Sequence, residues 1–173
     1  MYEFFCASLP ELSPGTPPPL SVEEFDLRAE AELSPRHFAV LKCDALHPAP
    51  AGEAELPGVY ARYVRFERYL RDRMARRRAD RAGESVNLPD PEEYFQTVDF
   101  RLGAVFSADN PAEREALIDR IRWDYLDELE EGHFFDFDFV CVYRLKTMLL
   151  TKLRGRSVEA GKVNFDAAVE SIE

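Results

Sequence analysis

The stretch that decides the fold of this chain spans residues 117–150 and reads LIDRIRWDYLDELEEGHFFDFDFVCVYRLKTMLL. Apolar residues recur at helical spacing in its first part, which predicts a helix with one apolar face. The residues of that face are Leu117, Ile118, Ile121, Tyr125 and Leu129. Gly132 lacks a Cβ and can adopt the left-handed conformation that ends a helix. From about Phe137 the chain is apolar on nearly every side, and such a helix must be buried. The apolar residues of this second part are Phe139, Val140, Cys141, Val142, Tyr143, Leu145, Met148, Leu149 and Leu150. The stretch therefore predicts a buried helical hairpin, and it contains no residues arranged for a reaction.

Four further helix starts are marked by capping signals. In each signal, a short polar side chain stands just before the first turn of the helix, where it can accept a hydrogen bond from a free backbone amide. A proline or a glutamate follows within that first turn. The four signals are Ser21 with Glu24, Ser34 with Pro35, Asp90 with Pro91 and Glu93, and Asn110 with Pro111 and Glu113. In addition, Leu33 is expected to pack on Phe38 as a hydrophobic staple.

Apolar spacing extends these starts into helices. The longest is predicted over residues 59–82, ending at Gly83, with an apolar stripe of Val59, Tyr63, Phe66, Leu70 and Met74. A helix over 91–106 is expected to bury Tyr94, Phe95, Val98, Leu102 and Val105. A short helix is expected over 165–172, and the run YEFFCASLPEL at residues 2–12 fits a helix or an extended segment equally well. No segment alternates as a strand does.

The fold class predicted is therefore all-α, a multi-helix bundle with a central buried helical hairpin. We expect a single domain over 1–173, with an N-terminal subregion at 1–57, core helices over 58–155 and a C-terminal extension at 156–173.

Composition narrows the classes of function. The chain has 173 residues and a net charge of −11, which disfavours general nucleic-acid binding because attraction to phosphates needs a basic surface. The three cysteines (Cys6, Cys43 and Cys141) form no CxxC pair, so a zinc site or disulfide framework is not expected. Cys141 is expected to be a buried, inert thiol. We find no signal peptide and no apolar run of the roughly 20 residues that span a bilayer, which predicts a cytoplasmic protein.

The helix over 59–82 is strongly basic. Its nine arginines and three acidic residues give it a charge near +6, so the remainder carries about −17. Arginine suits ion pairs at interfaces, and the segregation of charge indicates a docking face. The candidate partner-binding residues are Arg71, Arg73, Arg76, Arg77, Arg78 and Arg81. Neutralisation of these arginines by neighbouring acidic helices is the alternative interpretation.

The remaining clusters have a structural interpretation. Glu130, Glu131, His133, Asp136 and Asp138 could hold a metal ion, but Asp136 fits better as a helix cap. His37 is expected on the surface. The aromatic group of Trp123, Tyr125, Phe134, Phe135, Phe137 and Phe139 is expected to pack in the core. No GxSxG elbow and no phosphate-binding glycine loop is present, so no catalytic residue, metal or cofactor is predicted.

Several blocks resemble a known family. The opening YEFFCASLPEL with LSVEEF (20–25), the helix FERYLRDRMARRRADRAG (66–83) and the hairpin motifs ID-x-x-RW, LDELE-x-G, FD-x-DF and Y-x-LK together resemble an uncharacterised bacterial family. That family is encoded beside subunits of V-type ATPases. The blocks are also similar, more loosely, to the C/d-type subunit, the all-helical cap on the membrane rotor ring.

The resemblance implies a non-catalytic accessory or connecting subunit of a bacterial V-type rotary ATPase. Its partners would be the central shaft, the membrane rotor ring or both, with no nucleic acid. The chain would then lie on the inner face of the cell membrane through protein partners only. A soluble helical assembly factor or adaptor is the alternative function, and a metal-dependent hydrolase is a third.

Overall fold

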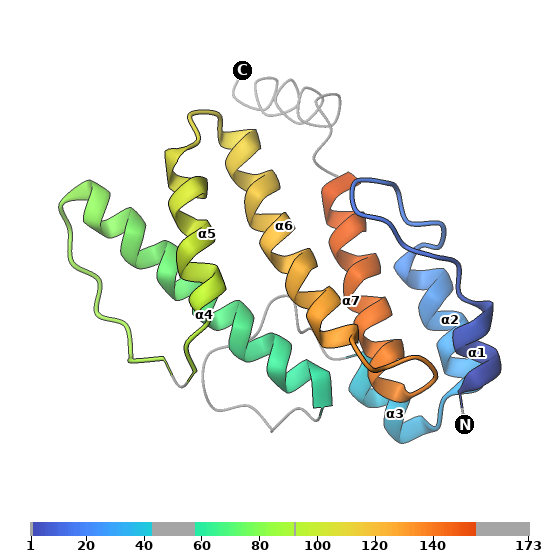
Figure 1. Cartoon of the computed structure of the whole chain (residues 1–173). Coiled ribbons are helices and arrows are strands. Elements are labelled where there is room, and N and C mark those ends of the chain that lie inside the picture. The colour runs from blue at the N-terminus through green and yellow to red at the C-terminus, as the bar shows by residue number, and fades with distance from the viewer. Residues whose placement is uncertain (1, 43–57, 92, 155–173) are drawn as a thin grey trace, which may run out of the picture.

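The helical hairpin predicted from residues 117–150 is present. The structure is a computed structural model that describes residues 2–42, 58–91 and 93–154. Helix α6 (Pro111–Glu130) and helix α7 (Phe137–Arg154) pack against each other, and Gly132 in the turn between them has a φ of 86° (Figure 1). The buried face of α7 is continuous, with Val140, Leu145 and Leu149 fully inaccessible to solvent. The hairpin therefore forms the centre of the core, as its apolar pattern predicts.

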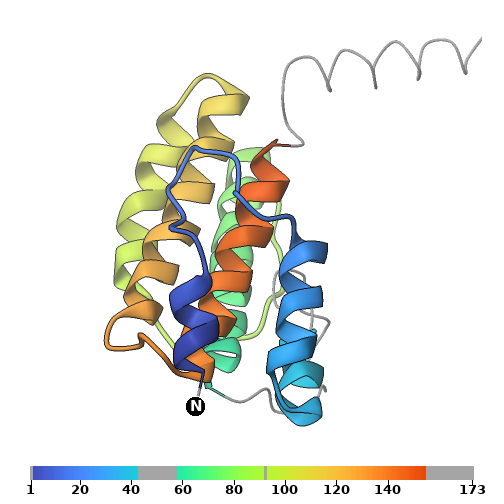
Figure 2. The same ribbon diagram turned by 90° about the vertical axis from the view of Figure 1, so that its right-hand side faces the viewer.

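Five more helices surround this hairpin, and no strand occurs among the described residues, so the all-α prediction is confirmed. They are α1 (Glu3–Ser8), α2 (Val22–Glu32), α3 (Pro35–Leu41), α4 (Gly58–Ala82) and α5 (Gln96–Ser107). Helix α7 lies between α6 and α2, while α4 runs obliquely across α5, α6 and α7 (Figure 1). Figure 2, viewed from the side of α1 and α2, shows α1 in front of the lower part of α7 and α2 to the right of α7. None of the helices in the described ranges is long and apolar enough to cross a bilayer.

Three of the four predicted helix starts are confirmed. Ser21 and Glu24 form a reciprocal capping box at α2, and the Ser34 hydroxyl accepts a hydrogen bond from the His37 amide at α3. Asn110 caps α6 by accepting a hydrogen bond from the amide of Ala112. Leu33 is buried and Phe38 partly so.

The predicted start of α5 at Pro91 is wrong, because this helix begins at Gln96. Tyr94, which was expected to be buried, is 68% exposed. The segment before the helix is held by contacts with α4 instead. The Arg76 guanidinium donates hydrogen bonds to the carbonyls of Leu88 and Pro89, at 3.2 and 3.0 Å. These long-range contacts outweigh the local capping signal.

The N-terminal run contains the helix α1, which decides between the two alternatives left by its sequence. Tyr2, Phe5 and Cys6 are buried against the core. His37, which was expected on the surface, is partly buried. The His37 ring stacks on Phe137 with centroids 4.2 Å apart, and its Nδ1 is hydrogen-bonded to the Tyr2 hydroxyl.

The predicted helix over 165–172 and the extension at 156–173 lie outside the described residues, as do Cys43, His47 and most of the loop before α4.

A buried ionic network joins α4 to α6. Arg122 makes a two-pronged contact with Glu67, through Nε at 2.9 Å and Nη2 at 2.8 Å, and its Nη1 binds Asp119 at 2.8 Å. The Glu67 side chain is 1% exposed and that of Asp119 is 3% exposed. Burial of unpaired carboxylates at such sites is costly, so the network fixes how α4 and α6 align.

A second buried network joins α2 to α7. Arg144 donates to Asp26 from Nε at 2.8 Å and from Nη2 at 3.2 Å, and Lys42 binds the same carboxylate at 2.7 Å. Burial alone would raise the pKa of Asp26, but the hydrogen bonds from Arg144 and Lys42 outweigh it and hold the pKa below its ordinary value. Asp26 is therefore ionised at neutral pH and anchors the N-terminal helices to the hairpin.

Candidate functional site

The predicted docking arginines all belong to α4, a helix that changes character along its length. Its first half is buried, with Tyr60, Tyr63 and Leu70 fully enclosed. Its last turns, beyond Met74, carry four of the six candidate docking arginines and reach past α5 in Figure 1. Arginine is a strong helix former, and its long side chain suits a face that the core does not cover. The sequence thus builds one helix with a buried anchor and a basic end.

Four of the six candidate arginines make contacts within the chain. Arg71 binds Glu67 one turn away at 2.8 Å, and Arg73 binds Asp99 of α5 through Nε at 2.5 Å. Arg76 holds the segment before α5, as described above. Arg81 donates to the Phe106 carbonyl at 2.8 Å and lies over the Phe106 ring. The interpretation of internal neutralisation therefore applies to a large part of the predicted face.

The Arg73 contact is reinforced by a tyrosine of the same helix. The Tyr69 hydroxyl donates to the second carboxylate oxygen of Asp99 at 2.6 Å. Burial and this hydrogen bond raise the pKa of Tyr69 to about 12, so the hydroxyl stays protonated at neutral pH. Asp99 thereby joins α5 to the middle of α4, which explains why Arg73 is a packing residue.

Arg77 and Arg78 differ from these four. Both side chains are exposed, and neither makes a hydrogen bond, ion pair or ring contact within the part of the chain that the structure describes. They are neighbours on the last turns of α4. The structure thus narrows the candidate docking face to this pair, with Arg81 close by.

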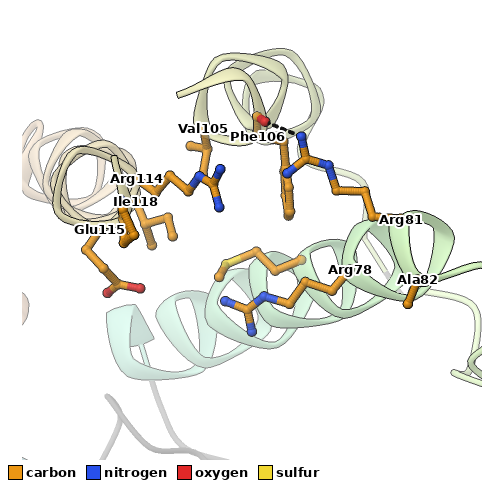
Figure 3. Close-up of a pocket in the computed structure, with 10 residues that line it drawn as sticks. Arg78, Arg81, Ala82, Val105, Phe106, Arg114, Glu115 and Ile118 are labelled. Carbon is orange, nitrogen blue, oxygen red and sulfur yellow. Dashed lines mark hydrogen bonds between the residues drawn. The ribbon is translucent and has the colours of Figure 1, made fainter. Parts of the chain in front are cut away.

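A groove lies beside this pair, between the C-terminal ends of α4 and α5 and the start of α6 (Figure 3). Its volume is about 540 Å³. Apolar side chains form much of its lining, namely Met74, Val105, Phe106 and Ile118, with Ala82 and Pro111. Three arginines also line it: Arg78 and Arg81 from α4, and Arg114 from α6. Glu115 is the acidic lining residue. An apolar groove with several fixed cations suits a ligand that is apolar and acidic at once.

The arginines of the groove keep their charge available. Arg81 and Arg114 donate to backbone carbonyls, of Phe106 and Ala108 respectively, and no ion pair with a carboxylate is made by either or by Arg78 within the described ranges. A carbonyl orients a guanidinium without neutralising it. Sequence reasoning singled out Arg78 and Arg81 but missed Arg114, because Arg114 reaches the groove only through the packing of α6 on α4.

The acidic cluster at the hairpin turn has the structural role that its sequence favoured. Asp136 caps α7 by accepting a hydrogen bond from the Phe139 amide at 2.9 Å, and its other oxygen lies 2.6 Å from His133 Nδ1. Glu130 pairs with Lys146 of α7. No group of three or more histidines, cysteines or acidic residues close enough to hold a metal ion occurs in the described part of the chain.

The predicted aromatic cluster is divided. Trp123 and Tyr125 are buried, and Tyr125 stacks on Phe66 with centroids 4.0 Å apart. Phe134 and Phe135, however, are 68% and 54% exposed in the hairpin turn, so their assignment to the core is wrong. The tight turn before Asp136 directs them outward.

Cys141 is buried as predicted, and its burial raises the pKa of the thiol far above its ordinary value, which keeps the thiol protonated and unreactive.

Comparison of the chain with models of protein families, with curated proteins and with solved structures gives no match.

Proposed function

We propose that this chain is a non-catalytic connecting or accessory subunit of a bacterial V-type rotary ATPase, which links the central shaft and the membrane rotor ring. In this proposal it acts in the cytoplasm, on the inner face of the membrane, and is held there by protein partners only. The basic end of α4 meets an acidic surface of one partner.

The sequence blocks that resemble the ATPase-associated family support this proposal. The block over 66–83 forms most of α4, and the motifs over 118–146 form α6, the turn and the first half of α7. These elements lie side by side in the core and are joined by the network of Glu67 and Arg122. The resemblance therefore covers one contiguous part of the molecule.

The observation that carries the proposal is the exposed pair Arg77 and Arg78 at the end of a helix whose other end is buried. A 25-residue helix is about 37 Å long. Because Tyr60 and Tyr63 are fully enclosed, a load applied at the arginine end passes into the core and not into a loose segment. Such a helix suits a connector, which must transmit force between two partners. Charge at the rim of an interface mainly sets its orientation and association rate.

Co-purification tests the proposal directly. The full chain, tagged and expressed in its native host, is isolated from gently solubilised membranes, separated by size exclusion and analysed by mass spectrometry. A subunit remains stoichiometric with the catalytic head and the membrane ring. An assembly factor is found with partial complexes and is lost from the mature enzyme. Recovery without any rotary ATPase subunit would refute the proposal.

A further inference from the structure

We propose that the groove between α4, α5 and α6 is the docking site for residues 163–173 of this same chain. This inference concerns the chain alone and does not depend on the function proposed above. Three observations carry it: the charge of the groove, the sequence of that segment, and the place where α7 ends.

The groove and the segment are complementary in charge. Arg78, Arg81 and Arg114 line the groove with one glutamate, Glu115. Residues 163–173 read VNFDAAVESIE, with three acidic residues (Asp166, Glu170 and Glu173) and no basic one. Guanidinium groups pair well with carboxylates, and the three arginines make no other ion pair among the described residues.

The apolar residues of the segment also match. Phe165, Val169 and Ile172 are separated by four and three residues, which is the spacing of one helical face. Asp166, Glu170 and Glu173 repeat the same spacing one position later, so a helix would carry them about 100° around from the apolar face. The apolar face would meet Met74, Val105 and Ile118 in the groove, and the acidic face would meet the arginines.

The segment can reach the groove. Helix α7 ends at Arg154, and the Lys152 Nζ lies 3.9 Å from an Asp119 carboxylate oxygen on α6. Asp119 is one turn from Glu115, which lines the groove. The eight residues 155–162 span at most about 26–29 Å when extended. That length exceeds the rise of about 6 Å along α6 between Asp119 and Glu115.

Covalent attachment makes a weak contact sufficient. A segment on a short tether has an effective concentration of about 1 mM. An 11-residue peptide that binds the groove with a Kd of about 0.1 mM would therefore be docked about ten times more often than it is free. Arg77 does not line the groove, so it stays accessible to a partner when the segment is docked.

Hydrogen exchange of the full chain, read by mass spectrometry, tests the proposal. We expect the amides of 163–173 to exchange about tenfold more slowly than the same peptide alone. The variant Arg78→Glu/Arg114→Glu should lose this protection. Arg77→Glu is the matched control, because it makes the same charge change beside Arg78 but outside the groove, and it should keep the protection.

Variants on the segment keep the test independent of folding. Asp166→Arg/Glu170→Arg alters no described residue and should lose protection as well. Combining it with Arg78→Glu/Arg114→Glu should restore protection, because each pair is then reversed. Wild-type exchange equal to that of the free peptide would overturn the proposal. So would protection that is insensitive to these reversals, or protection that disappears on dilution together with a dimer, since the occupant would then belong to a second copy.

Discussion

Replacing Arg122 with methionine tests the claim that a buried ionic network fixes α4 against α6. Methionine has a similar length and helix propensity, so the substitution chiefly removes charge and hydrogen bonds. It leaves Glu67, whose side chain is 1% exposed, with the half-exposed Arg71 in place of its two-pronged partner, and it also takes the Nη1 contact from Asp119. Removal of one partner from a buried pair costs about 3–5 kcal/mol. For a chain of this size, each kcal/mol lowers Tm by about 2–4 °C, so a fall of about 6–20 °C is expected.

Urea unfolding followed by Trp123 fluorescence measures this loss. Trp123 is the single tryptophan of the chain and is 4% exposed, so its emission reports the packing of α6 directly. Arg120→Met is the control, because Arg120 pairs with Asp124 on the same helix at 2.8 Å but its side chain is 60% exposed. An exposed pair contributes about 0–1 kcal/mol, so the control should unfold close to the wild type.

A compensating variant separates the charge from the packing. Glu67→Met/Asp119→Leu/Arg122→Met removes the network altogether and leaves no uncompensated buried charge, so it should regain much of the lost stability. Equal unfolding midpoints for Arg122→Met and Arg120→Met would refute the reasoning. The α4–α6 alignment would then depend on apolar packing alone.

Three further variants test other parts of the structure. Asp26→Asn should destabilise the protein by about 3 kcal/mol at pH 7. The pKa of Asp26 is lowered in the folded state, so the stability that its charge contributes is fully present above the ordinary pKa near 4 and is lost as pH falls through the lowered pKa. In acid titrations, the free energies of unfolding of the two proteins should therefore begin to converge below about pH 4 and meet only below the lowered pKa. Leu145→Ala should cost about 2–5 kcal/mol in urea unfolding, because Leu145 is fully buried in the centre of α7, and a cost below about 1 kcal/mol would mean that this helix is not central. Asp136→Ala should cost about 1 kcal/mol by the same assay, while Asp136→Asn keeps the capping oxygen and should be nearly neutral; equal losses would indicate that the contact with His133, not the cap, matters.

The helix faces and most helix starts could be predicted because they depend on local spacing. The stripe of α4, the hairpin and the caps at Ser21, Ser34 and Asn110 follow from apolar period and capping chemistry. The start of α5 could not be predicted in this way. Asp90 and Pro91 carry a good local signal, but Arg76 from another helix holds the preceding carbonyls, and a local pattern contains no information about that contact.

The buried networks have a signal in the sequence itself. Glu67 lies four residues after Tyr63 and three before Leu70, which places it on the apolar stripe itself. On α6, Arg122 lies four residues after Ile118 and four before Leu126, which places it on an apolar face as well. Opposite charges on two apolar stripes indicate a buried pair, since neither charge is stable there alone. The groove, in contrast, needed the packing of three helices and could not be read from spacing.

The most direct test of the central claim, that the exposed end of α4 docks on a rotary ATPase, is a membrane-binding measurement with Arg77→Glu, because Arg78 also lines the groove. Arg76 is left unchanged because it supports the fold. Purified full chain is added to native membranes stripped of it, and bound protein is quantified against salt concentration. We predict saturable binding of the wild type that weakens with salt, co-elution with V-type ATPase subunits, and a loss of at least about tenfold in the variant, whose circular dichroism should be unchanged. Equal binding by the two proteins would contradict the account.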